Sequence, residues 1–248
     1  MLLNKLKILV TRPVHQSESL CSLIEYQGGE AVKLPVIQIV DCNNNWQDYN
    51  FNNFDMAIFI SSNAVEKTLS NIALPTKLQL FAVGKNTTTT LQKLGLTALC
   101  PAPPFNSETL LLMPQLQTIV NKQIVIFRGK GGRELLAESL RKRNAKVQYI
   151  SVYQRLKPPT PTKNIYADIT TITSGEGLEN LLAMLPNSAW IRQNPMVVIS
   201  ERLAKKAKQL GIEAPILVAP NASNEGLLIA ILQAANIAIL NSTINYLC

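Results

Sequence analysis

Histidine and cysteine are scarce in this 248-residue chain. The only histidine is His15, and Cys21, Cys42, Cys100 and Cys248 are scattered, without a Cys-x-x-Cys pair. Zinc sites and disulfide scaffolds need clusters of these residues, so we expect no metal and no disulfide framework. No serine or cysteine motif accompanies the histidine as a nucleophile–base pair. We interpret His15, which opens a predicted helix, as a surface residue.

Long apolar runs are also missing. Only Ile8-Leu9-Val10 follows the charged first residues, which is too short a run for a signal peptide. The most apolar stretch, residues 226–248, is interrupted by Gln233, Asn236, Asn241 and Asn245, whereas a bilayer span needs about 20 apolar residues. We therefore expect a cytoplasmic protein without a membrane partner, whose tail after about residue 235 packs against a helix or another protein.

Aromatic residues make up only 6% of the chain, although 24 basic against 16 acidic side chains give a net charge of +8. Such a charge suits nucleic acid, an anionic membrane surface or an acidic small molecule. The one dense basic run, Arg141-Lys142-Arg143, ends an amphipathic segment, where basic groups suit a helix C-terminus. We therefore expect no nucleic-acid partner. The 47% apolar content excludes a disordered chain.

Short apolar runs alternate with helical patterns along most of the chain. Continuous apolar strands, each followed by a helix, are typical of parallel sheets covered on both faces, so the sequence predicts an α/β fold. The predicted strands are Lys7–Thr11, Met56–Ile60, Leu80–Val83, Thr97–Cys100, Gln123–Phe127, Lys146–Ile150, Ile169–Thr173, Met196–Ile199 and Pro215–Val218.

The two halves of the chain resemble each other. Ile58–Val65 is echoed by Thr171–Leu178, but the strand that ends in arginine comes last in the middle half, at Arg128, and first in the outer half, at Arg12. One domain inserted in the other explains this order. We predict an outer α/β domain of residues 1–34 plus 158–248, an inserted α/β domain of residues 36–157, and a two-stranded linker at about 35–40 and 151–157.

Small, hydroxyl-bearing or basic residues recur at the ends of the predicted strands. Ligands of doubly wound sheets bind at this edge, near helix N-termini. Backbone amides, hydroxyls and a few cations suit an anionic ligand with many carboxylates. The candidate segments are Thr11-Arg12, Ser61-Ser62-Asn63, Gly84-Lys85-Asn86-Thr87, Arg128-Gly129-Lys130, Ser174-Gly175 and Ser200-Glu201.

Each of these features also has a structural interpretation. Taken singly, Ser62, Ser174 and Ser200 are better explained as helix N-caps. The run Arg128–Arg133 looks like a phosphate loop but lacks the spacing Gly-x-x-x-x-Gly-Lys-Ser/Thr, and a flexible turn explains it too. Tyr153 is explained as a packing aromatic or as a functional group.

Taken together and in order, these motifs resemble the uroporphyrinogen-III synthase family. The resemblance reaches about residue 235 and is most specific at Phe127–Leu136 and Val152-Tyr153-Gln154-Arg155. Two departures are mild: Ser61 stands where threonine is common, and Glu201 places an acid beside an expected carboxylate site. The remaining matches are Val10–Pro13, Phe59–Val65, Ala82–Thr87, Leu140–Arg143, Thr173-Ser174-Gly175 and the Ser200 segment.

The resemblance implies two flavodoxin-like domains joined by a two-stranded linker, with no metal and no organic cofactor. It implies a lyase of haem biosynthesis that cyclises linear hydroxymethylbilane to uroporphyrinogen III, with loss of water and inversion of the last pyrrole ring. The substrate carries eight carboxylates, which gives the basic balance a purpose. Tyr153 matches the family's hinge tyrosine, which makes it the candidate that helps the hydroxyl leave. The candidate substrate-binding residues are Arg12, Ser61, Ser62, Asn63, Gly84, Lys85, Thr87, Arg128, Lys130, Ser174 and Ser200.

We expect a monomer that receives its substrate by transient hand-over from the preceding pathway enzyme. Two other classes share the twin α/β pattern. A two-lobed ligand-binding protein is usually exported and would carry a signal. A nucleotide-sugar transferase is normally longer and needs a nucleotide site, which Arg128–Arg133 does not supply.

Overall fold

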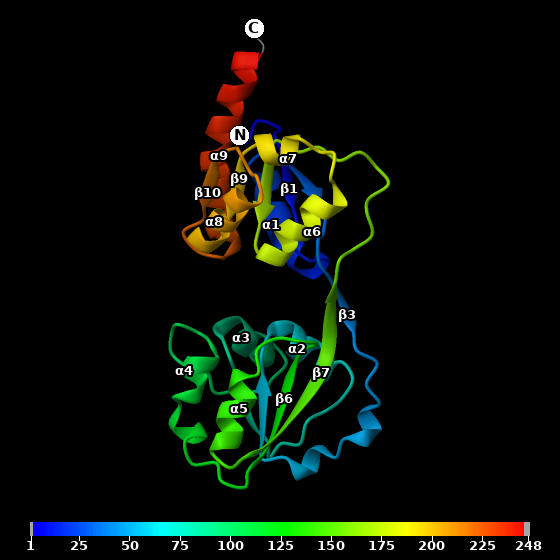
Figure 1. Ribbon diagram of the computed structural model, residues 1–248, viewed down its shortest axis with the longest axis vertical. Helices are drawn as coiled ribbons and strands as arrows, with labels where there is room; N and C mark the ends of the chain where they lie inside the picture. Colours follow the sequence, from blue (N-terminus) through cyan, green and yellow to red (C-terminus); the bar gives the residue numbers. More distant parts are fainter. Residues whose placement is uncertain (1, 246–248) are drawn as a thin grey trace. The chain divides into compact units, whose positions relative to one another are not determined.

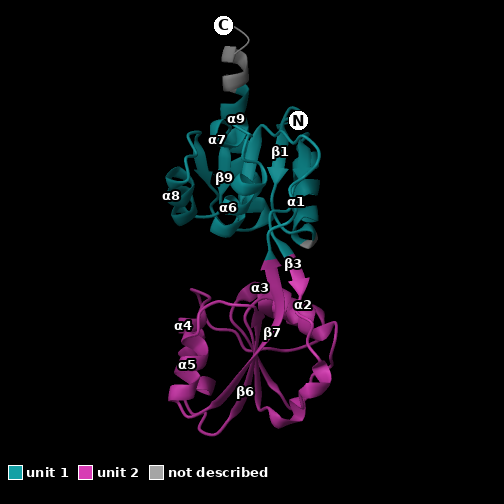
Figure 2. Cartoon of the chain, turned by 45° about the vertical axis from the view of Figure 1, so that its right-hand side comes forward, with its two compact units in different colours: residues 1–38, 156–248 teal, residues 39–155 magenta. Residues whose placement is uncertain are grey.

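The computed structural model describes residues 2–245, without the side chains of His15 and of residues 240–245 (Figure 1). The interpretation of the His15 side chain therefore lies outside the described residues. The chain forms two compact units (Figure 2). Unit 1 consists of residues 1–38 and 156–248, and unit 2 consists of residues 39–155.

Unit 1 is built on a five-stranded parallel sheet in the order β10-β9-β8-β1-β2. Numbered within the unit, this is the flavodoxin-like order 2-1-3-4-5. The predicted α/β class with parallel sheets is confirmed. The strands are β1 (Lys7–Val10), β2 (Glu30–Lys33), β8 (Ile169–Ile172), β9 (Met196–Val198) and β10 (Ile216–Val218).

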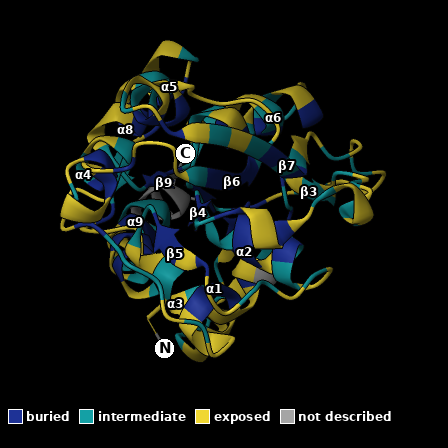
Figure 3. Ribbon diagram, turned by 90° about the horizontal axis from the view of Figure 1, so that it is seen from below, coloured by how far each residue is buried: buried dark blue, intermediate teal, exposed yellow. Residues whose placement is uncertain are grey.

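Helices cover both faces of this sheet because successive strand residues point to opposite sides. Ile8 and Val10 are fully buried against the helices α1 and α9, whereas Leu9 packs on the side of α6, α7 and α8. In Figure 3 the helices show buried and exposed faces in different colours. The helices of unit 1 are α1 (Val14–Tyr26), α6 (Gly175–Met184), α7 (Trp190–Gln193), α8 (Glu201–Gln209) and α9 (Asn224–Asn245).

Unit 2 repeats the three-layer arrangement around a sheet in the order β3-β7-β6-β4-β5. Its strands are β3 (Gln38–Asp41), β4 (Met56–Phe59), β5 (Gln79–Ala82), β6 (Gln123–Gly129) and β7 (Lys146–Leu156). One face packs on α2 (Ser62–Leu69) and α3 (Lys85–Lys93), and the other on α4 (Ser107–Leu111) and α5 (Leu135–Lys142). Three short 3-10 helices are η1 (Trp46–Asp48), η2 (Phe51–Asn53) and η3 (Pro114–Leu116).

The strands that lead to Arg12 and Arg128 occupy the same place in both sheets. β1 lies between β2 and β8, and β6 lies between β7 and β4. Counted from β6, the series β7-β6-β4-β5, with a bridge at Leu99 as its fifth member, repeats the order 2-1-3-4-5. Unit 2 is thus a circularly permuted version of unit 1, which explains why its arginine strand comes late in the sequence.

Two strand predictions were wrong. Thr97–Cys100 forms only a single parallel bridge between Leu99 and Phe81, because Pro101 has no amide hydrogen with which to extend the ladder. β2, at Glu30–Lys33, was not predicted, because its two apolar residues stand between charged ones at the edge of the sheet. The predicted strand Lys146–Ile150 and most of the predicted linker segment 151–157 form one strand, β7, which ends at Leu156, and β3 lies beside it in the same sheet.

The helix α9 packs on the core of unit 1. Leu227, Ala230, Ile231 and Ala234 are fully buried against the sheet and α1, and Ala238 packs on the same cluster. The side chains beyond residue 239 lie outside the described part, so the expectation for the rest of the tail is not examined by the structure. Among the described residues, no helix has the length and apolar character to cross a membrane.

Asp55 ties the start of β4 to the start of β6. Its carboxylate accepts hydrogen bonds from the Gln123 amide at 2.8 Å and from Lys122 Nζ at 3.0 Å. The amide bond is the main cause that lowers the pKa of Asp55, followed by the bond from Lys122. A carboxyl whose pKa is depressed by folding stabilises the protein above its unfolded pKa of about 3.9, and this contribution disappears as the pH falls through the lower folded value.

We therefore expect Asp55→Asn to lower the free energy of unfolding at pH 7 by up to about 1 kcal/mol, a figure reduced for solvent screening. The amide oxygen of asparagine can still accept the Gln123 bond, so the loss reports the charge. Urea unfolding of both proteins at pH 7, 5 and 3.5 measures it, and the difference should shrink at the lowest pH. A difference independent of pH would contradict this explanation.

Candidate functional site

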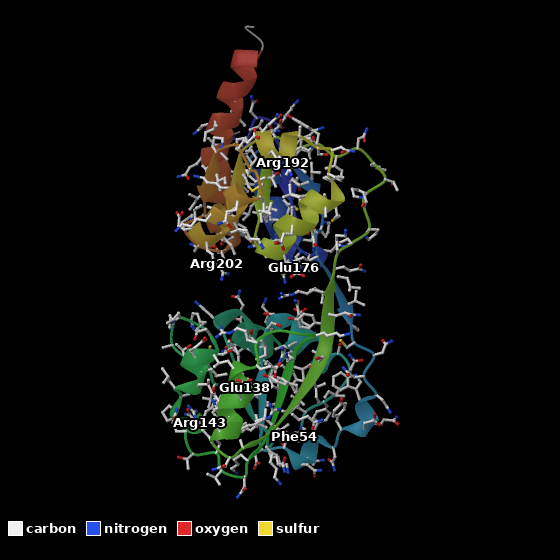
Figure 4. All side chains as sticks on the ribbon, in the orientation of Figure 1. Phe54, Glu138, Arg143, Glu176, Arg192 and Arg202 are labelled. Atoms are coloured by element: carbon white, nitrogen blue, oxygen red, sulfur yellow. The ribbon has the colours of Figure 1, made fainter. Side chains whose placement is uncertain are left out.

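A cavity of about 280 Å³ opens at the carboxyl ends of β6 and β7 in unit 2. Parallel strands present their ligand sites at this edge, and Figure 4 places the labelled Phe54 and Arg143 at the other edge of the unit, away from it. The cavity is lined by Ile60, Ser107, residues 128–133, Leu136, Tyr149, Tyr153 and Arg155.

Tyr153 brings a buried side chain with a hydroxyl group to this cavity. Its side chain is only 3% exposed, and its Oη lies 3.1 Å from Ser61 Oγ. Ser61 Oγ also accepts a hydrogen bond from the Ala64 amide, which fixes the serine. The ring lies on Gly129, where a Cβ would come within 2.7 Å of Tyr153 Cζ. The absence of a side chain at Gly129 is therefore what allows the phenol to occupy this position.

Arg128 binds its own loop. It is 7% exposed, its Nη1 donates to Glu134 Oε1 at 2.8 Å, and its Nη2 donates to the Gly131 carbonyl. Nε bonds the Gly129 carbonyl at 3.3 Å, and the guanidinium lies 4.3 Å from the centroid of the Tyr149 ring. These contacts fold the glycine-rich loop, so carboxylate binding by Arg128 stays a prediction and its visible role is positional.

The loop next to Arg128 supplies exposed cations. Lys130 lines the cavity, its amide donates to the Tyr153 carbonyl at 2.7 Å, and it makes no ion pair with a described residue. Arg133 lines the same cavity but pairs with Glu108. Lys130 is thus the cation of this loop that remains available to a ligand carboxylate.

The starts of α2 and α3 lie at the same edge of the sheet. Ser61, rather than Ser62, is the N-cap of α2, which corrects the interpretation of Ser62 as a cap. Ser62 and Asn63 begin the helix and are half-buried, whereas Thr87 in α3 is buried, with 5% exposure. Gly84 caps α3, and Lys85 is exposed beside it. Helix N-termini leave amides without intrahelical partners, so both helices offer backbone donors here.

In unit 1, Arg12 mirrors Arg128. Its Nη1 donates to Asn224 Oδ1 at 2.6 Å and its Nη2 to the Ala222 carbonyl at 2.8 Å, so it holds the loop that precedes α9. Burial lowers the pKa of the Arg12 guanidinium. Like Arg128, it has donors engaged within its own unit, and binding of substrate by Arg12 stays a prediction.

Ser174 and Ser200 cap α6 and α8, where their hydroxyls accept the amides of Gly177 and Leu203. Both serines line a second cavity, of about 320 Å³. Figure 4 shows the labelled Arg202 and Glu176 near this edge of unit 1 and Arg192 at the opposite edge. The other lining residues are Thr173, Gly175, Ile199, Arg202, Leu203 and Lys206.

Three residues at or beside the two cavities were not predicted from the sequence: Glu134, Tyr149 and Lys206. Glu134 directly follows the run Arg128–Arg133, and its ion pair with Arg128 depends on how the loop folds, so no sequence pattern indicates it. Tyr149 and Lys206 gave no signal, because their positions depend on contacts between elements. Among the described side chains, no group of three or more His, Cys, Asp or Glu is placed to hold a metal ion.

Comparison with known proteins identifies the family. A family model described as "Uroporphyrinogen-III synthase HemD" matches residues 18–229. The chain is 32% identical to the uroporphyrinogen-III synthase of Escherichia coli over 91% of this chain and 100% of that protein, and 32% identical to that of Salmonella typhimurium with the same coverage. The fold matches a crystal structure of the Helicobacter pylori uroporphyrinogen-III synthetase with a TM-score of 0.62 at 15% identity, over 92% of this chain and 99% of that one. The chain therefore belongs to the uroporphyrinogen-III synthase family.

Proposed function

We propose that this chain is a lyase that cyclises linear hydroxymethylbilane to uroporphyrinogen III, with loss of water and inversion of the last pyrrole ring, in haem biosynthesis. Its membership of the family supports the reaction. The observation that carries the chemistry is the buried Tyr153 hydroxyl, bonded to Ser61 at the edge of a cavity that is lined by a basic glycine-rich loop.

Tyr153 is the proposed proton donor. Its phenolic O–H can pass a proton to the departing hydroxyl, so that the carbon–oxygen bond breaks and water leaves. The pyrrole ring supplies the electron pair, and its N–H proton returns to the phenolate through the released water. The products are then a neutral azafulvene, water and an unchanged tyrosine. Ser61 Oγ, at 3.1 Å, can donate to the phenolate oxygen in the meantime.

The steps after the loss of water depend on how the substrate is oriented. The substituted carbon of the last ring attacks the azafulvene, and the spiro intermediate fragments and recombines with that ring inverted. Without guidance the bilane closes to the uninverted type I isomer, so an oriented substrate decides the product. We assign this orientation to carboxylate contacts with Lys130, the amides at the starts of α2 and α3, and the hydroxyls of Ser174 and Ser200.

The proposal includes a cytoplasmic monomer that takes its unstable substrate directly from the preceding pathway enzyme. Light scattering at working concentration measures the oligomeric state. The hand-over is measured as the type III product that still forms when a reagent captures any bilane released into solution.

The test of function supplies the protein with freshly generated hydroxymethylbilane, oxidises the products and separates the type I and type III isomers. Predominantly type III product is expected, against type I from matched samples that lack the protein or contain heat-denatured protein. Type I alone from a folded sample would overturn the proposed activity and favour a two-lobed binding protein.

A further inference from the structure

Lys206 crosses from α8 to the start of α6 in unit 1. Its Nζ lies 2.8 Å from Glu179 Oε1, and its chain lies directly over Gly175. A Cβ at Gly175 would come within 2.9 Å of both Cδ and Nζ of Lys206. The missing side chain at Gly175 thus leaves room for the Lys206 side chain in the cavity that Ser174 and Ser200 also line.

The ion pair that holds Lys206 is weak. The side chain of Lys206 is 36% exposed and that of Glu179 is 53% exposed, and exposed pairs contribute little because water and salt screen them. The ammonium group can therefore exchange Glu179 for another carboxylate at little cost. Arg12, by contrast, donates to its own loop through both terminal nitrogens.

We propose that Lys206 is a substrate-binding residue of unit 1, which takes a carboxylate of the bilane in exchange for Glu179. This inference rests on the proposed function. Glu179 pairs with the ammonium group of Lys206 and competes with the substrate for it. Gly175 keeps the path between Lys206 and the serine hydroxyls open.

Removal of either partner is expected to change KM in opposite directions. Lys206→Met removes a charge-assisted contact with the substrate and should raise KM about threefold to fivefold, with kcat within about twofold of the wild type. Glu179→Gln removes the competitor and should lower KM about twofold. In the double variant, KM should equal that of Lys206→Met, because Glu179 acts only through Lys206.

Lys208→Met is the matched control. It removes the same charge from the same helix, but Lys208 is exposed and does not line the cavity. Initial rates of type III formation are measured at low and high ionic strength, and the effect of Lys206→Met should shrink with salt. All variants change partly exposed or exposed side chains, so unfolding by urea should remain close to that of the wild type.

Different outcomes would overturn the proposed activity and the proposed role of Lys206. Type I product from the wild-type protein would overturn the proposed activity. Type III product with equal KM for Lys206→Met and Lys208→Met would overturn the role of Lys206 alone. A rise of KM in Glu179→Gln would also contradict it, because the carboxylate would then support binding rather than compete with the substrate.

Discussion

Tyr153→Phe is expected to lower kcat for type III formation at least about 100-fold, while KM changes little. A positioned general acid typically contributes a factor of about 10² to 10⁴. Phenylalanine keeps the ring that packs on Gly129 in the buried core of unit 2, so the substitution removes the hydroxyl and little else. Steady-state rates with freshly generated bilane, corrected for spontaneous closure to type I, measure this effect.

Two further variants serve as controls for Tyr153→Phe. Tyr49→Phe removes another phenol of the same unit, next to the first residues of β6 and β7, and should leave kcat unchanged. Ser61→Ala removes both the partner of Tyr153 Oη and the cap of α2, which should cost about 0.5–2 kcal/mol of stability but reduce kcat much less than Tyr153→Phe. Equal, small losses in Tyr153→Phe and Ser61→Ala would instead indicate an enzyme that acts by orientation alone.

The sequence predicts the sheet cores well because their strands are buried on both faces. Continuous apolar runs such as Met56–Phe59 and Met196–Val198 are readily recognised. The edge strand β2 carries charge at both ends and lacks this signal. The bridge at Leu99 has the apolar signal but stands just before Pro101, where the ladder cannot continue. Edges of sheets are thus where the local pattern is least informative.

The candidate site is predicted less completely for a different reason. The predicted strand ends correctly place Ser61, Arg128 and Ser174 at the carboxyl-terminal edge of their sheets, because the parallel topology brings those ends together. What a side chain does there depends on its neighbours. Arg128 binds Glu134 and the Gly131 carbonyl, and no spacing rule distinguishes such a positional arginine from one that faces a ligand.

Gly129 determines where the phenol ring of Tyr153 lies, so its substitution is expected to have a large effect on the reaction. The strand register between β6 and β7 shifts at Arg128 and Gly129, which places Gly129 opposite Tyr153. A Cβ here would lie 2.7 Å from Cζ, 2.8 Å from Cε2 and 3.0 Å from Oη of that ring. Gly129 does not have a left-handed backbone, so collision with the ring, rather than backbone strain, decides the effect of a larger residue.

We therefore expect Gly129→Ala to displace the phenol from Ser61 and to lower kcat about tenfold to 100-fold, because a misplacement of about 1 Å is enough for such a loss. Overpacking should also lower the free energy of unfolding by about 1–3 kcal/mol, so rates are measured at a temperature where urea titration shows the variant fully folded. In the Tyr153→Phe background the same substitution should reduce kcat little further, because the hydroxyl that it displaces is already gone. Additive losses in the double variant would mean that Gly129 serves the reaction through the loop around Lys130 and not through the position of Tyr153.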